Sequence, residues 1–116
     1  MRQPTFFEKD QASGQIDDRA LTLYALGDFQ SRGKVLAERE LPLDRLRGAL
    51  RRATELNGLD EMTDERAVEA LRALGANVRQ VPAFFAKHPF RVTVPVDLAD
   101  RARDVYAAQL DADKRD

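Results

Sequence analysis

The chain has 116 residues, of which 43% are apolar and 34% charged, and its formal net charge at neutral pH is only −1. This length fits one domain, and the apolar share can form a hydrophobic core, so the composition excludes a disordered chain. The near-neutral charge excludes a strong overall attraction to nucleic acid or membranes, and any such attraction must come from local clusters. The absence of cysteine excludes disulfides and thiolate chemistry and agrees with a cytoplasmic location.

The first fifteen residues are expected to form an extended arm, in which Phe6 and Phe7 are the only bulky apolar groups. Because two exposed rings would be costly, we expect them to hold the arm against the domain, with a partner contact as the alternative. The start lacks the pattern of an export signal, and no stretch approaches the roughly 20 apolar residues that cross a bilayer. We therefore expect neither export nor contact with a membrane.

Residues 17–29 predict a first helix. Asp17 and Asp18 suit its start, because a carboxylate there accepts hydrogen bonds from free backbone N–H groups and favours the positive end of the helix dipole. The apolar residues that follow cover most sides of the helix, which predicts a central position. Ser31 is expected to cap a short second helix over 34–38.

Two further helices are indicated by apolar periodicity and by end signals. Apolar residues recur at steps of three and four in the first of them, and these are Leu43, Leu46, Leu50, Ala53 and Leu56. This spacing predicts a helix over 43–57 that an Asn-Gly pair ends. The next helix is predicted over 63–74, with Thr63 as its cap and Gly75 as its stop.

After the helix predicted over 63–74, apolar residues recur at every second position. This change predicts a two-stranded antiparallel hairpin near residues 78–94, with its tip at 86–89. Asp97 is expected to cap a last helix, and the charged tail 111–116 to fray. The predicted fold is therefore an α-rich α+β single domain over 16–110, with four to five helices and one wing-like hairpin. The expected core residues are Leu46, Leu50, Leu71, Leu74, Val92 and Val105.

The sequence offers no recognisable catalytic or metal-binding set. His88 is the only histidine, and no cysteine accompanies it to complete a zinc site. Neither serine lies in a nucleophile-elbow pattern. The acidic run between Asp60 and Glu69 could hold magnesium or supply an acid and a base, but the start of a helix explains its carboxylates better. We therefore expect no enzyme, no cofactor and no small-molecule substrate.

Local charge gives the clearest functional signal. Between Arg32 and Arg52 there are seven basic and three acidic residues, a local balance of +4, and no acidic residue occurs from Gly75 to Val96. A basic helix and a basic hairpin are typical of phosphate contacts. The expected nucleic-acid-binding residues are Arg45, Arg47, Arg51, Arg52, Lys87 and Arg91. Alternatively, the arginines of helix 43–57 keep that helix solvated and pair with Asp44 and Glu55.

In element order the chain resembles the winged helix-turn-helix domains. The segment GKVLAERELPLDRLRGALRRATELNGL is similar to their paired helices, with Ala37 in the packed position of the first helix, a turn at 41–43, and Arg45, Arg47 and Arg51 on the second. The resemblance implies a recognition helix in the major groove and a hairpin wing on the DNA backbone or in the minor groove. It favours a small DNA-binding protein, either a regulator or an accessory of DNA processing.

A second hypothesis is a small protein-interaction factor, such as an adaptor, an inhibitor or an assembly protein. Its basis is a group of three rings on the predicted hairpin, Phe84, Phe85 and Phe90. Adjacent residues of a regular strand point to opposite faces, so we expect Phe84 or Phe85 to remain exposed. An exposed ring on an edge hairpin could anchor a partner protein or a second copy of the chain. A continuous basic strip would favour nucleic acid, and a bare aromatic patch would favour protein.

Overall fold

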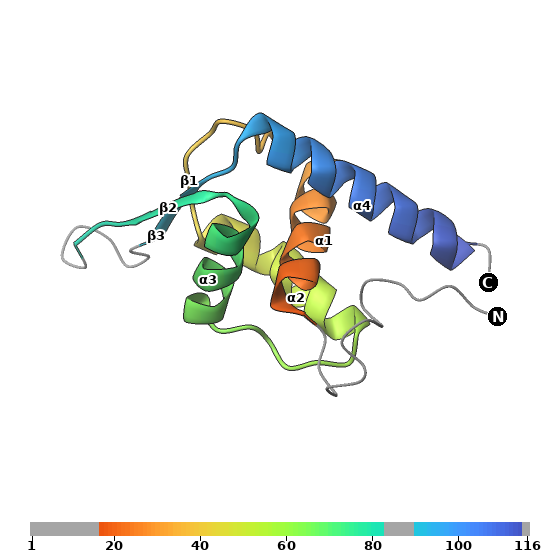
Figure 1. Ribbon diagram of the computed structural model, residues 1–116. Helices are drawn as coiled ribbons and strands as arrows, with labels where there is room; N and C mark the ends of the chain where they lie inside the picture. The colour runs from red at the N-terminus through yellow and green to blue at the C-terminus, as the bar shows by residue number, and fades with distance from the viewer. Residues whose placement is uncertain (1–16, 83–89, 115–116) are drawn as a thin grey trace.

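The computed structural model describes residues 17–82 and 90–114 (Figure 1). The elements of these segments are α1 (Asp18–Ser31), β1 (Leu41–Pro42), α2 (Asp44–Leu56), α3 (Asp64–Leu74), β2 (Asn77–Gln80), β3 (Phe90–Thr93) and α4 (Val96–Lys114). The α-rich α+β class predicted from the sequence is confirmed. The predictions that concern the arm 1–15, the hairpin residues Phe84, Phe85, Lys87 and His88, and the last two residues lie outside the described residues.

Helix α1 is the centre of the fold, as its apolar sequence predicts. Asp17 caps it, because the carboxylate accepts a hydrogen bond from the Arg19 backbone N–H at 2.9 Å. Every residue from Ala20 to Phe29 is buried. The reason is that α2, α3 and α4 all pack against this helix, as Figure 1 shows.

The crossing of α1 and α4 is unusually close at Gly27. A Cβ atom added at this position would lie 2.4 Å from both the Ala102 carbonyl oxygen and the Tyr106 Cβ. One turn away, the rings of Tyr24 and Tyr106 pack with their centroids 5.0 Å apart and their planes tilted by 55°. The hydrogen atom of Gly27 therefore lets the two helices approach to a distance that any other residue would prevent.

The sheet contains one strand more than the sequence predicts. Strands β2 and β3 pair antiparallel, which confirms the hairpin arrangement over the described residues, and Val78 lies opposite Val92. The additional strand is β1, which pairs antiparallel with the other side of β3 and gives the order β1-β3-β2. Pro42 is compatible with this position because it lies at the end of an edge strand, where its missing N–H removes no ladder hydrogen bond.

The short helix predicted after Ser31 does not form. Ser31 is the last residue of α1, and its hydroxyl donates to the Asp28 carbonyl of the same helix at 2.7 Å instead of capping a following one. The backbone then has positive φ angles at Gly33 (81°) and Glu38 (61°), which a right-handed helix cannot contain. Ala37 instead forms a parallel β-bridge with Val94. The first of the two paired helices in the winged helix-turn-helix resemblance is therefore absent from residues 32–40.

Helix α4 differs from the prediction at both ends. It begins at Val96, so Asp97 lies in its first turn and does not cap it. The Val96 backbone N–H donates to the Glu38 carboxylate at 3.3 Å, so a distant side chain satisfies the helix start. At the other end the helix continues to Lys114, although the sequence predicts a frayed tail from residue 111. No helix of the described segments combines the length and the apolar character needed to cross a membrane.

The predicted core is largely confirmed. Four of the expected residues are buried, namely Leu46, Leu50, Leu71 and Val92, and the other two, Leu74 and Val105, are half-buried and pack against the same cluster. Leu56 is the exception within the apolar stripe of α2, because it is the last residue of the helix and 69% of its surface is exposed.

Replacing Gly27 by alanine should destabilise the protein by roughly 1–3 kcal/mol, because α1 and α4 must move apart to accept the methyl group. Urea denaturation measures this loss as a free energy of unfolding. Gly48→Ala in α2 is the matched control, because its added Cβ meets only the Arg52 guanidinium, at 3.5 Å. The control should stabilise the protein by about 0.5–1 kcal/mol through helix propensity. Equal stability of the two variants would contradict the close crossing.

Truncating Leu50 to alanine should cost roughly 2–5 kcal/mol of unfolding free energy, because the buried side chain leaves a cavity. Leu56→Ala is the control on the same helix, and its exposed side chain should contribute less than about 0.5 kcal/mol. Chemical denaturation of both variants gives the comparison. A loss at Leu50 as small as the loss at Leu56 would mean that the rotation of α2 about its axis is wrong.

Candidate functional site

The arginines of α2 lie on two different faces of the helix. An α-helix turns by about 100° per residue, so residues seven positions apart return to almost the same face. Arg45 and Arg52 are related in this way and line a pocket beside the end of α1. Arg47 and Arg51 lie on another face, which is turned toward the loop before α3. The four arginines predicted as one contact surface therefore belong to two separate environments.

The face that carries Arg47 and Arg51 is neutralised by acidic neighbours. Arg47 bridges two carboxylates, with Nη1 at 3.2 Å from Glu61 and Nη2 at 2.8 Å from Asp64. Arg51 Nη2 lies 3.7 Å from the same Glu61 oxygen. These ion pairs connect α2 to the loop and to the first turn of α3. They also occupy both arginines within the protein, so this face offers less positive charge than the sequence suggests.

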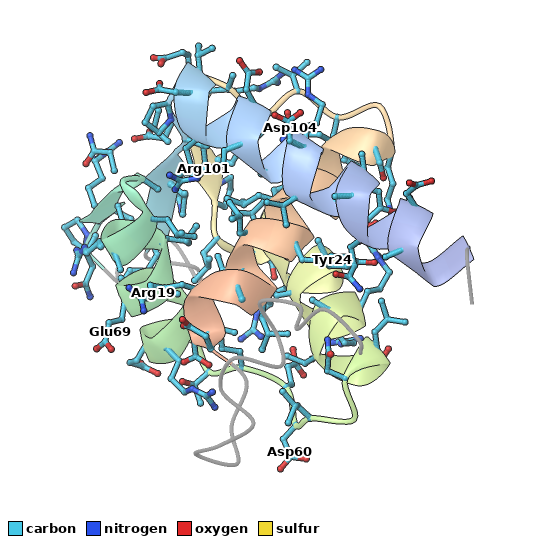
Figure 2. All side chains as sticks on the ribbon, turned by 45° about the vertical axis from the view of Figure 1, so that its right-hand side comes forward. Arg19, Tyr24, Asp60, Glu69, Arg101 and Asp104 are labelled. Carbon is cyan, nitrogen blue, oxygen red and sulfur yellow. The ribbon has the colours of Figure 1, made fainter. Side chains whose placement is uncertain are left out.

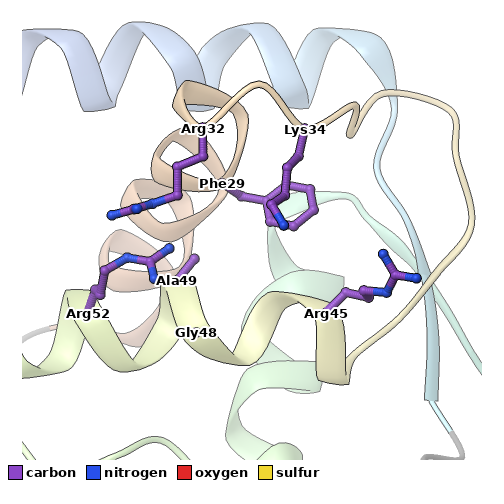
Figure 3. Close-up of a pocket in the computed structure, with 7 residues that line it drawn as sticks. All are labelled: Phe29, Arg32, Lys34, Arg45, Gly48, Ala49 and Arg52. Atoms are coloured by element: carbon purple, nitrogen blue, oxygen red, sulfur yellow. The ribbon is translucent and has the colours of Figure 1, made fainter.

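The other face of α2 contributes to a cationic pocket with a volume of about 400 Å³. The pocket lies between the end of α1, the loop that follows it and one face of α2 (Figure 3). Its lining residues are Phe29, Arg32, Lys34, Arg45, Gly48, Ala49 and Arg52. Arg45 and Arg52 were predicted as contact residues from the sequence. Arg32 and Lys34 were counted in the basic segment but were not identified as contacts, because only the tertiary structure brings them to α2.

Asp28 holds two of the pocket's cations in place. Its side chain is only 4% exposed, and its two oxygens accept hydrogen bonds from Arg32 Nε at 3.2 Å and from Arg52 Nε at 2.6 Å. Within the described residues, no hydrogen bond uses the Nη groups of either arginine. Asp28 is not a lining residue, so the carboxylate lies behind the guanidinium groups. Four cations and one carboxylate leave a net charge of +3 around the pocket.

The remaining two cations enter from opposite sides. Figure 3 shows Lys34, like Arg32, extending from the loop after α1, whereas Arg45 extends from α2. Lys34 Nζ lies 5.9 Å from the ring centroid of buried Phe29, a cation–π contact. Arg45 lies in the first turn of α2, and no carboxylate of the described segments forms an ion pair with it. The pocket is therefore lined by positive charge from two elements.

The hairpin places another pair of arginines together. Arg79 of β2 and Arg91 of β3 are register partners and point to the same face of the sheet. Glu40 pairs with one of them, because its oxygens accept hydrogen bonds from Arg79 Nε at 2.6 Å and Nη2 at 2.9 Å. These hydrogen bonds are the main cause that lowers the pKa of Glu40, and the charges of Arg79 and Arg91 act in the same direction. The same hydrogen bonds raise the pKa of Arg79.

Helix α3, which directly precedes the hairpin, has an acidic outer surface. Glu65 and Glu69 are exposed, and Figure 2 shows Glu69 pointing away from the body of the molecule. Arg66 forms two hydrogen bonds with Asp18, at 2.9 and 2.5 Å, which raise the pKa of the arginine. Arg72 donates to a backbone carbonyl of β2 at 3.1 Å. This helix therefore presents carboxylates to solvent, whereas Arg66 and Arg72 form hydrogen bonds with other parts of the same protein.

One of the three rings on which the protein-interaction hypothesis depends is not exposed as a bare ring. Phe90 is half-buried and packs against the hydrophobic core, so it is not a bare anchor. Phe84 and Phe85 lie outside the described residues. In the described part of the chain, no group of histidine and carboxylate side chains is placed to hold a metal ion.

Comparisons of the chain with protein-family models, with curated protein sequences and with solved structures find no match. A candidate functional site is therefore identified by its geometry and its charge. By both measures, the cationic pocket between α1 and α2 is the strongest candidate of the described surface.

The Glu40–Arg79 pair predicts a pH dependence of defined sign. Because the pKa of Glu40 is lower in the folded than in the unfolded chain, the pair stabilises the fold above the unfolded-state pKa, and this stabilisation is lost as the pH falls through the folded-state pKa. An NMR titration should find the Glu40 carboxyl ionising below the range of a free glutamate. Arg79→Gln should shift this pKa upward, and an unchanged value in that variant would contradict the pair.

Proposed function

We propose that the protein binds DNA by contacting its phosphate groups, with the cationic pocket as the main contact surface. The observation that supports this proposal is that four cationic side chains line one pocket, and that two of them bind Asp28 through Nε while their Nη groups form no hydrogen bond among the described residues. Neutralising backbone phosphates supplies most of the affinity of sequence-tolerant DNA binding. Guanidinium groups match phosphate oxygens in geometry and charge.

The proposed contact set differs from the one predicted from the sequence. It consists of Arg32, Lys34, Arg45 and Arg52, and the hairpin residues Lys87 and Arg91 remain part of the proposal. Arg47 and Arg51 are omitted because Glu61 and Asp64 already neutralise them. The protein would act as a regulator or an accessory of DNA processing in the cytoplasm, as a binding protein without a cofactor.

With the helix predicted at 34–38 absent, the winged helix-turn-helix resemblance assigns the role of recognition helix to a different element. The helix pair that precedes the hairpin is α2 and α3, so α3 would occupy the position of the recognition helix. Its exposed Glu65 and Glu69 would meet phosphates with like charge, which disfavours insertion of α3 into a groove. We therefore place the duplex on the side of α1 and α2, where contacts to the backbone favour sequence-tolerant binding.

The rival function, binding of a protein partner or of a second copy, now depends on Phe84 and Phe85. Phe90 supports it less than the sequence suggested, because the side chain is partly buried against the core. The large apolar side chains exposed on the described surface are Val35, Leu56, Val96 and Leu110, and none of them is aromatic. DNA binding remains the proposal that the described charges support better.

The DNA-binding proposal predicts that the affinity for a duplex depends steeply on salt concentration, and that residues of the pocket contribute to this dependence. Affinity for a labelled duplex, measured by fluorescence anisotropy over a series of salt concentrations, should fall strongly as salt rises. Lys34→Gln combined with Arg45→Gln should weaken binding and reduce the slope of log K against log salt by about 0.9 for each phosphate contact that is lost. Neither residue pairs with a described carboxylate, so the fold should be retained.

The matched control is Arg47→Gln combined with Arg51→Gln, which removes the same charge from the opposite face of α2. This variant should keep nearly the wild-type slope. A wild-type protein that binds no duplex at low salt would refute DNA binding. Equal losses in the two double variants would show that net charge, and not the pocket, determines the affinity.

A further inference from the structure

The floor of the cationic pocket contains a glycine in the middle of a helix. Gly48 lies in α2, is exposed and lines the pocket together with Ala49. Glycine is unfavourable inside a helix, and Gly48 has an ordinary helical position and needs no positive φ. A Cβ atom at this position would meet only Arg52 Nη1, at 3.5 Å. The missing side chain therefore has one evident structural effect, which is to leave the pocket open above the helix.

We propose that this pocket holds a single phosphate group of the DNA backbone, seated above Gly48 between the Nη groups of Arg32 and Arg52, with Lys34 and Arg45 on the opposite side. This inference rests on the proposed function and makes it more specific, because it assigns one discrete phosphate subsite within the basic surface. The volume of about 400 Å³ exceeds that of one phosphate group, and the remaining space accommodates several waters at roughly 30 Å³ each.

The arrangement around Asp28 explains how the subsite is prepared before a ligand arrives. Asp28 and Arg32 lie one turn apart on α1 and at its end, whereas Arg52 belongs to α2, so the packing of the two helices sets the spacing of the guanidinium groups. Each arginine uses its Nε on the buried carboxylate and keeps its Nη donors for a ligand. Side chains that are already ordered lose less entropy on binding. We therefore assign Asp28 the role of a positioning residue, since it would not touch the phosphate itself.

The sharpest test fills the pocket without changing its charge. Gly48→Leu places an apolar side chain above the helix where the phosphate would sit and should also favour helix formation. It should weaken duplex binding about tenfold or more, the loss expected when charge-assisted hydrogen bonds to one phosphate are removed, and lower the salt slope by about 0.9. Ala73→Leu, which adds the same side chain at an exposed position of α3, is the matched control and should bind like wild type. Circular dichroism and thermal melting verify that both variants fold.

A second measurement uses inorganic phosphate as the probe. Titration into the ¹⁵N-labelled protein should shift the backbone amide signals of Gly48 and Ala49 in a saturable manner, and these shifts should be absent in Gly48→Leu. The subsite is overturned if phosphate leaves these amides unchanged or if Gly48→Leu binds duplex as tightly as wild type. In that second case the DNA-binding proposal survives, provided that the Lys34 and Arg45 substitutions still weaken binding. Saturable phosphate shifts without any duplex binding would instead refute DNA binding and identify a site for a small phosphate compound.

Discussion

The close packing of α1 inside the other three helices is the constraint on which the rest of the structure depends. Gly27 allows α4 to approach α1 directly, with no space for a Cβ atom between them. The next residue along the chain, Asp28, faces a different side of α1 and contacts α2 through Arg52. Two consecutive residues thus fix the helices on either side of α1. The position of α2, and with it the geometry of the cationic pocket, follows from this crossing.

Asp28 links the stability of this packing to the chemistry of the surface. A carboxylate that is 4% exposed is costly to bury unless it is paired, and the guanidinium groups of Arg32 and Arg52 supply that pairing. Both arginines are about half exposed, so they remain part of the surface while the carboxylate belongs to the interior. The same hydrogen bonds therefore stabilise a buried charge and orient two exposed ones. The pairing that buried Asp28 requires therefore also orders the cationic surface.

The elements that the sequence predicts correctly are those whose signals act locally. Thr63 caps α3 through its own side chain, and Gly75 ends that helix with a φ angle of 108°, both within a few residues. The helix predicted at 34–38 fails because tertiary contacts override its weak propensity, since Ala37 pairs with a segment more than fifty residues away. Strand β1 could not be predicted either. It contains two residues, and only its pairing with β3 makes it a strand.

The candidate site was predictable in part. Counting charges located the basic segment, and helical geometry alone could have separated Arg45 and Arg52 from Arg47 and Arg51. The sequence could not show that Glu61 neutralises one of these faces, because that ion pair depends on the path of a loop. The outcome is a helix with a cationic face toward α1 and a neutralised face toward acidic α3. A polyanion approaching the protein meets attraction on one side of α2 and carboxylates on the other, so the charge distribution itself selects the orientation in which it docks.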